Sequence, residues 1–220
     1  SPVRVSGLLT SVAWSTPKDV RYMLEGSVNA VGSALDWVRR LSAGMPTDLR
    51  ASADPSRLPI VIPAFAGLAA PHWRSDAGAA IFDLQPSMGL GEMHAATLAG
   101  IACRIREIVE QMEKGGIRAR RILVSGGLAR SARLLPFQAA LLGRPIYPVS
   151  SEEATARGAA LLALQAGSSK AFRGARLPNS AAGAIRGGRL RPAAEVYYQR
   201  FESRMARLLS RPFPARDGVS

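Results

Sequence analysis

The chain has 220 residues, which is enough for one large domain or two small ones. Hydrophobic residues make up 47% of it, but no apolar run is long enough to span a membrane. Its single cysteine, Cys103, rules out a disulfide framework, suits a reducing cytoplasm and, with only two histidines, argues against a zinc site. The formal net charge of +13 comes mainly from arginines spread along the chain without interleaved aromatic residues, so we favour a solvated basic surface over a nucleic-acid site.

Apolar patterning predicts strands first and then alternating strands and helices. In chain order we expect strands at 7–14 and 20–24, a helix at 28–41, strands at 58–65 and 79–84, a helix at 91–114, a strand at 121–125, a helix at 131–142, a strand at 145–149, and helices at 152–165 and 192–209. The first two strands are joined by a short turn and form a hairpin. This order indicates an α/β domain with a mixed sheet.

The helix at 91–114 has the clearest pattern, because its apolar residues from Leu98 to Met112 recur at spacings of three and four. We expect this stripe and Cys103 to lie in the core. The opposite face carries charged residues that can pair at helical spacing, Arg104 among them. His94, near the start of the helix, is expected at the surface.

Three parts are expected along the chain. Residues 1–166 form the main domain, and residues 167–192, where Gly, Ser, Arg and Pro dominate, form a linker or flap. Residues 193–210 form a terminal helix that packs on the same domain. Its packing face is predicted to consist of Tyr198, Phe201, Met205 and Leu208.

The segment Ile122–Ser131 carries the clearest functional signal. An apolar strand, Ile122–Val124, is followed by the pair Gly126-Gly127 and then by a helix start near Ser131. Paired glycines between a strand and a helix let the backbone approach a ligand with no side chain in the way. Such turns are common and usually structural, so this one gains weight only from other motifs in the chain.

Those other motifs stand in a consistent order around it. They are Gly7–Trp14 (GLLTSVAW), Tyr22–Ser27 (YMLEGS), Gly32–Trp37 (GSALDW), Pro63–Trp73 (PAFAGLAAPHW) and Glu153–Ala160 (EATARGAA). Together with the glycine pair, they resemble the C-terminal domain of the carbohydrate kinases that include glycerol kinase, xylulokinase and gluconokinase, over roughly residues 7–210. The YMLEGS stretch makes glycerol kinases the most similar branch.

The resemblance implies a ribonuclease-H-like (actin-like ATPase) domain, with a mixed β-sheet flanked by helices, that forms one half of a cytoplasmic two-domain enzyme. Such enzymes use ATP and Mg²⁺ and transfer the γ-phosphoryl group to a hydroxyl of a polyol or sugar. The family's catalytic aspartate and polyol-binding residues precede the equivalent of Gly7. We therefore expect no catalytic or metal-binding residue in this chain, a need for an N-terminal kinase domain as partner, and no activity without it. The family also often forms homo-oligomers.

The nucleotide-binding residues implied by the resemblance are Gly32, Asp36, Gly126, Gly127 and Ser131. The paired glycines would let the adenosine lie against the backbone, and Ser131 would hydrogen-bond the base or the ribose. Asp36 stands where the family often has an amide. Its carboxylate would repel phosphate but could bind the ribose or magnesium.

Two departures from the family leave other functions open, and one of them is the turn after Trp73, which has Arg74 and Gly78 in place of the usual Asp and Arg. Ala95 and Ala99 stand where relatives commonly carry Arg and Glu. Together with the arginine excess, this keeps two alternatives: a non-catalytic binding or interaction module of the same fold, and a basic nucleic-acid-binding domain. An affinity for DNA that falls steeply with salt would favour the second alternative.

Overall fold

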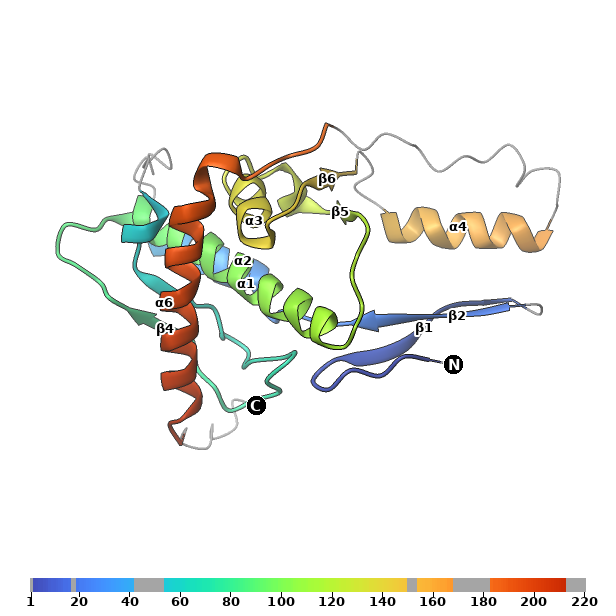
Figure 1. The fold of residues 1–220 in the computed structure, drawn as a ribbon, viewed down its shortest axis with the longest axis horizontal. Helices are drawn as coiled ribbons and strands as arrows, with labels where there is room; N and C mark the ends of the chain where they lie inside the picture. The colour runs from blue at the N-terminus through green and yellow to red at the C-terminus, as the bar shows by residue number, and fades with distance from the viewer. Residues whose placement is uncertain (1, 17–18, 42–53, 150–153, 168–182, 213–220) are drawn as a thin grey trace.

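Strands and helices alternate along the chain in the computed structural model, which describes residues 2–16, 19–41, 54–149, 154–167 and 183–212 (Figure 1). The strands are β1 (Leu9–Thr16), β2 (Asp19–Glu25), β3 (Ile60–Ile62), β4 (Ala80–Phe82), β5 (Ile122–Val124) and β6 (Ile146–Pro148). The helices are α1 (Val31–Leu41), α2 (Leu90–Lys114), α3 (Leu134–Leu142), α4 (Ala154–Gly167) and α6 (Arg191–Leu209). Short 3₁₀ turns are η1 (Pro55–Arg57), η2 (Gly127–Arg130) and η3 (Gly188–Leu190). No described helix has both the length and the apolarity needed to cross a membrane.

The described strands form three two-stranded sheets. β1 and β2 pair antiparallel from Leu9 opposite Glu25 to Thr16 opposite Asp19, which confirms the expected hairpin. β3 pairs antiparallel with β4, and β5 pairs parallel with β6. The α/β class is confirmed, and both parallel and antiparallel strand pairs are present. Among the described residues these pairs form separate sheets, whereas one mixed sheet was expected.

Most predicted elements are present, and several are shorter than the sequence pattern indicated. The strand expected at 58–65 keeps only Ile60–Ile62, since Pro59 and Pro63 flank it and proline has no N–H for a strand ladder. The helix expected from Ser131 begins at Leu134, after η2. The longer internal stretches outside the described residues are 42–53 between the expected helix at 28–41 and the expected strand at 58–65, 150–153 before α4, and 168–182 of the expected linker.

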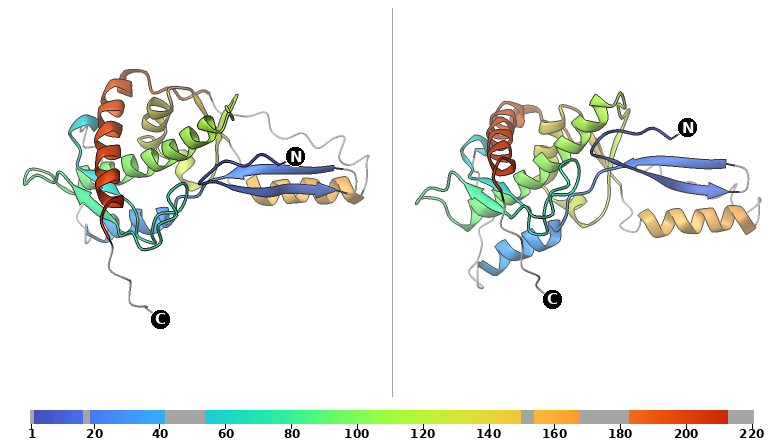
Figure 2. Two further views of the ribbon diagram at one scale, coloured as in Figure 1. Left: turned by 60° about the horizontal axis from the view of Figure 1, so that its bottom comes forward. Right: turned by 90° about the horizontal axis from the view of Figure 1, so that it is seen from below.

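Helix α2 is the element on which the others pack. α1, α3 and β3 all contact it, and Figures 1 and 2 show it running through the middle of the part that contains α1, α3 and α6. Of its predicted apolar stripe, Leu98, Ile101 and Ile108 are buried, and Ile105 and Met112 are partly buried. At Gly100, α2 and β3 approach so closely that a Cβ atom would lie 2.1 Å from the carbonyl oxygen of Val61.

Helix α6, the last described helix, packs against the core. The predicted packing face is confirmed, and the structure adds Ala194 and Tyr197, both fully buried. The Tyr197 hydroxyl hydrogen-bonds the carbonyl oxygens of Pro59, at 3.1 Å, and Ala96, at 3.3 Å. One buried hydroxyl therefore joins α6 to α2 and to the segment that enters β3.

A charged cluster also joins α6 to α2. Arg106 pairs with Glu195 of α6 at 2.7 Å and with Glu110 of its own helix at 2.7 Å. Its guanidinium lies 3.8 Å from the centroid of the Tyr198 ring, and the Tyr198 hydroxyl donates to Glu110. Burial lowers the pKa of Arg106, but the hydrogen bonds to Glu195 and Glu110 outweigh it and raise the pKa above its usual range, so the arginine stays charged.

Two residues of α2 differ from the sequence-based expectation. Arg104 is only 1% exposed, because the loop at 66–77 folds over it; it donates to the carbonyl oxygen of Ala70 and pairs with Glu107. A buried arginine needs such partners, since an unpaired buried charge is costly. His94 is half-buried, and its Nδ1 is enclosed with no hydrogen-bond partner among the described residues. It was expected at the surface, and it is more buried than that expectation.

The end of the expected linker is part of the packed fold. Ile185 exchanges two backbone hydrogen bonds with Ile146 of β6, at 3.1 and 2.9 Å. A Cβ atom on Gly187 would lie 2.1 Å from the backbone nitrogen of Ala140, so this segment lies directly against α3. Glycine, which indicated a linker in the sequence, here allows the segment to pack closely against α3.

Asp83, next to β4, binds two arginines of α6. Its carboxylate accepts hydrogen bonds from Arg200 at 2.9 Å and Arg204 at 2.7 Å. Burial raises the pKa of Asp83, but the hydrogen bonds from Arg204 and Arg200 outweigh it and hold the pKa below its usual value. Because the folded state has the lower pKa, this stabilisation is present above the unfolded pKa and is lost as the pH falls through the folded pKa.

We expect Asp83→Asn to lower the free energy of unfolding by about 1 kcal/mol at pH 7, because the two arginines lose their charged acceptor. Asparagine tolerates the positive φ of +60° at this position, so the backbone is not the cause. Urea unfolding of both proteins at several pH values should show the difference shrinking below about pH 4. A difference that is unchanged at pH 3 would contradict this assignment.

We expect Gly100→Ala to destabilise the fold by roughly 2–4 kcal/mol, since the methyl group would force α2 away from the β3 backbone. Gly158→Ala on α4 is the matched control, because a Cβ atom there meets nothing within 4 Å. That control should be neutral or stabilising by up to about 1 kcal/mol, as alanine is the better helix former. Chemical unfolding measures both; equal effects would show that α2 and β3 are not in tight contact.

Candidate functional site

The glycine pair after β5 forms an open turn. Gly126 has φ +90° and ψ −177°, a backbone conformation that residues other than glycine rarely adopt. η2 then begins at Gly127, and the N–H of Ala129 donates to the carbonyl oxygen of Gly126 at 3.0 Å. A Cβ atom at either glycine would meet no atom within 4 Å. The backbone of this turn therefore faces open space.

Ser131 links this turn to α3. Its N–H donates to the carbonyl oxygen of Leu128 at 3.0 Å, and its Oγ accepts from the N–H of Leu134 at 3.1 Å. A serine oxygen at a helix start satisfies one of the otherwise unpaired N–H groups. The hydroxyl proton can still be donated. Ser131 thus has a structural role in starting α3, and it keeps one donor for a ligand.

Helix α1 carries the other two predicted residues. Gly32 and Asp36 are four residues apart, so they share one face of the helix. The side chain of Asp36 is 51% exposed and pairs with Arg39 at 2.9 Å. A Cβ atom on Gly32 would meet nothing within 4 Å. The structure places this residue pair on α1, whereas the glycine turn and Ser131 lie between β5 and α3; both α1 and α3 pack on α2.

The glycines differ in what their missing side chains make room for. At Gly26, Gly100 and Gly187 a Cβ atom would come within 3.0 Å of the protein's own atoms, so internal packing explains them. At Gly32 and Gly127 there is neither a collision nor a positive φ. Glycine inside a helix costs about 1 kcal/mol relative to alanine. Gly158, Gly183 and Gly188 share this open environment, so packing explains none of these glycines and only the motifs distinguish Gly32 and Gly127.

His94 of α2 interacts electrostatically with residues next to both segments and was not identified as a site residue from the sequence. Burial lowers the pKa of His94, and the positive charges of Arg133, next to α3, and Arg39, on α1, lower it further. The imidazole is therefore neutral at pH 7. No sequence signal could have found this position, because a lone histidine near a helix start has no spacing partner.

The described residues supply no cluster for a metal ion, since nowhere do three or more His, Cys, Asp or Glu side chains gather. Asp36 is the only acid among the predicted site residues. Mg²⁺ that is bound through nucleotide phosphates needs only one or two protein carboxylates. The residues present therefore fit a metal carried on the ligand better than a metal held in a protein cage.

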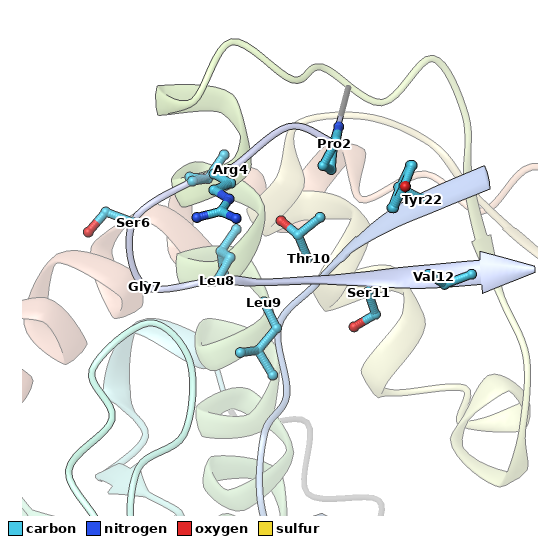
Figure 3. Close-up of a pocket in the computed structure, with 11 residues that line it drawn as sticks. Pro2, Arg4, Ser6, Gly7, Leu8, Leu9, Thr10, Ser11, Val12 and Tyr22 are labelled. Atoms are coloured by element: carbon cyan, nitrogen blue, oxygen red, sulfur yellow. The ribbon is translucent and has the colours of Figure 1, made fainter. Parts of the chain in front are cut away.

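A separate cavity lies at the N-terminal end of the chain. It has a volume of about 530 Å³ and lies between residues 2–6 and the hairpin, with Thr10 and Tyr22 on the hairpin side (Figure 3). Thr10 donates to the carbonyl oxygen of Val3 at 2.6 Å, which holds the two sides together. None of the predicted site residues lines this cavity.

Sequence comparisons agree with the motifs. The profile of the C-terminal domain of the FGGY family of carbohydrate kinases matches residues 1–167. The glycerol kinase of Natranaerobius thermophilus is 35% identical over 164 residues, and that of Lactobacillus delbrueckii subsp. bulgaricus is 39% identical over 165 residues. Each alignment covers 72% of this chain and 33% of the relative. The match thus spans about a third of the length of these curated relatives.

Solved structures share the fold over almost the whole chain. A Plasmodium falciparum glycerol kinase, determined with ADP, has a TM-score of 0.77 at 24% identity, covering 96% of this chain and 44% of that one. A xylulose kinase from Lactobacillus acidophilus has a TM-score of 0.76 at 19% identity, covering 94% of this chain and 44% of that one. The profile match, with the expected motifs in order, shows that this chain belongs to the FGGY family of carbohydrate kinases and holds its C-terminal domain.

Proposed function

We propose that this chain is the nucleotide-binding part of a glycerol kinase-like enzyme that transfers the γ-phosphoryl group of ATP to a hydroxyl of a polyol or sugar. The observation that carries the proposal is that the open backbone at Gly32 and Gly127, where a Cβ atom would meet nothing within 4 Å, coincides with two of the motifs that carry the family resemblance. Both glycines stand at positions that the family resemblance assigns to the nucleotide. The Plasmodium falciparum glycerol kinase was determined with ADP, and this supports an adenine nucleotide as the ligand.

In this proposal the adenosine lies against the turn at Gly126 and Gly127, where no side chain keeps it from the backbone. The Ser131 hydroxyl donates to the base or the ribose while its oxygen continues to cap α3. The Asp36 carboxylate accepts from ribose hydroxyls, and its pair with Arg39 holds it in place. Mg²⁺ is carried on the phosphates, where it neutralises charge during phosphoryl transfer.

The rest of the catalytic machinery belongs to an N-terminal kinase domain outside this chain. Phosphoryl transfer needs a carboxylate to accept the hydroxyl proton, and we assign none here. The hairpin supports such a partner, because Leu9, Val12 and Tyr22 are each at least 50% exposed. Exposed apolar side chains on an isolated two-stranded ribbon indicate a surface that another segment covers. We place the assembled enzyme in the cytoplasm, where the one cysteine of this chain stays reduced.

The two alanines that depart from the family are consistent with a working domain. Ala95 and Ala99 are four residues apart on α2; Ala95 packs against the core and Ala99 is 4% exposed. An Arg–Glu pair at such positions would be largely buried. Replacing a buried ion pair by apolar packing is often neutral or stabilising. The substitutions therefore do not by themselves favour a module that has lost its function.

We expect a titration with MgADP, followed by amide NMR, to shift the resonances of 126–131 and 32–36 and to leave the arginine-rich segments unchanged. Gly127→Ala and Gly32→Ala should each weaken binding roughly tenfold, because the methyl group occupies the ligand's space, and neither should destabilise the fold. Gly183→Ala, another position where a Cβ atom meets nothing within 4 Å, is the control and should bind as the unsubstituted chain does.

The opposite pattern would overturn this assignment. Shifts scattered over the basic segments, with no loss in Gly127→Ala or Gly32→Ala, would mean non-specific attraction of phosphate. The absence of shifts from the chain even after an N-terminal kinase domain is supplied would mean that nucleotide binding has been lost.

We expect the chain alone to show no glycerol-dependent turnover of ATP in a coupled ADP-release assay. The physical reason is that positioning and the proton-accepting carboxylate are split between two domains. Adding a family N-terminal kinase domain in the same polypeptide is the positive control and should give turnover. Glycerol-dependent turnover by the chain alone would disprove the division of roles.

A further inference from the structure

A second hollow lies at the opposite end of α3 from the glycine turn. It has a volume of about 220 Å³ and lies between the C-terminal end of α3 and the segment that leads into α6. Three arginines, Arg144, Arg186 and Arg191, contribute to its wall, together with Gly187 and Gly188, and no acidic residue lines it. A concave surface whose charged lining is all positive is the complement of an anion.

Each arginine is held in place by a different part of the fold. Arg144 pairs with Glu113 of α2 and hydrogen-bonds the carbonyl oxygen of Ala119. Arg191, the first residue of α6, lies over the turn that ends α3, so that a Cβ atom on Gly143 would be 3.4 Å from its Nη2. Arg186 follows Ile185, whose backbone pairs with β6. The wall is therefore built by packed elements.

The positive charge in this hollow is only partly compensated. Glu113 neutralises Arg144, whereas Arg186 and Arg191 make no ion pair with the residues that the structure describes. The hydrogen bond from Arg106 lowers the pKa of Glu195, and the charge of Arg191 lowers it further. The Glu195 carboxylate therefore interacts with Arg191, but it is already paired with Arg106. Like charges held together in a concave site repel one another unless an anion lies between them.

We propose that this hollow binds a small phosphorylated anion. Arginine matches phosphate because its planar guanidinium can donate two parallel hydrogen bonds. Gly188 adds to the match, since a Cβ atom there would meet nothing within 4 Å and the backbone is open to a ligand. The lining includes no aromatic residue on which a nucleic-acid base could stack, so we assign a small ligand.

This site is distinct from the proposed nucleotide site. The nine residues of α3 separate the two, a distance of about 13 Å along the helix axis. None of the residues assigned to the nucleotide lines the hollow. The inference therefore stands or falls independently of the proposed function.

The test is a titration of the chain with inorganic pyrophosphate at constant ionic strength, followed by amide NMR. We expect saturable shifts at Gly143, Gly187 and Gly188, and the same shifts in the Gly127→Ala variant, which is altered only at the nucleotide site. The double variant Arg186→Gln, Arg191→Gln should raise the dissociation constant tenfold or more, because two charged donors are lost. Arg189→Gln, an exposed arginine on η3 that does not line the hollow, is the matched control and should change it less than twofold.

Three results would overturn the proposal. A linear, non-saturating response would mean that pyrophosphate only screens the basic surface. Equal weakening by Arg189→Gln and by the double variant would mean that net charge rather than the hollow decides binding. Displacement of pyrophosphate by a short DNA duplex, with a steep salt dependence that the double variant does not reduce, would assign the charge to a nucleic-acid surface.

Discussion

The close packing of α2 against its neighbours is the constraint on which the rest of the structure depends. At Gly100 the helix touches the β3 backbone so tightly that no side chain fits between them. α1 and α3 pack on the same helix, and α6 is tied to it through the buried Tyr197 hydroxyl. Both halves of the candidate nucleotide site, the α1 face and the turn before α3, are therefore positioned by their contacts with α2.

Several arginines join elements of the fold through ion pairs, in spite of the chain's basic composition. Arg104 and Arg106 are bound to carboxylates of their own helix, and Asp83 holds two arginines of α6. Arginines used in this way do not contribute a free positive surface, because their charge is already paired. The charge is unevenly distributed, and the arginines that line the hollow at the end of α3 are only partly paired.

The candidate site was predictable from sequence to the extent that it consists of glycines in ordered motifs. Gly126 and Gly127 follow an apolar strand, and the family resemblance added Gly32, Asp36 and Ser131. What the motifs could not give is the reason for each glycine. The same residue type fills the tight α2–β3 contact in one place and leaves open space in another, and only the distances to neighbouring atoms separate these cases.

The sequence by itself determined the order and type of the elements, the hairpin, the apolar stripe of α2 and the family, because periodicity and motif spacing are local properties of the chain. The tertiary structure decided which other element covers each face. It buried Arg104 beneath the loop at 66–77, shielded the Nδ1 atom of His94 from solvent and placed the end of the expected linker against α3. The physical reason is that a side-chain pattern shows which face of a helix or strand is apolar, whereas burial depends on segments far away along the chain.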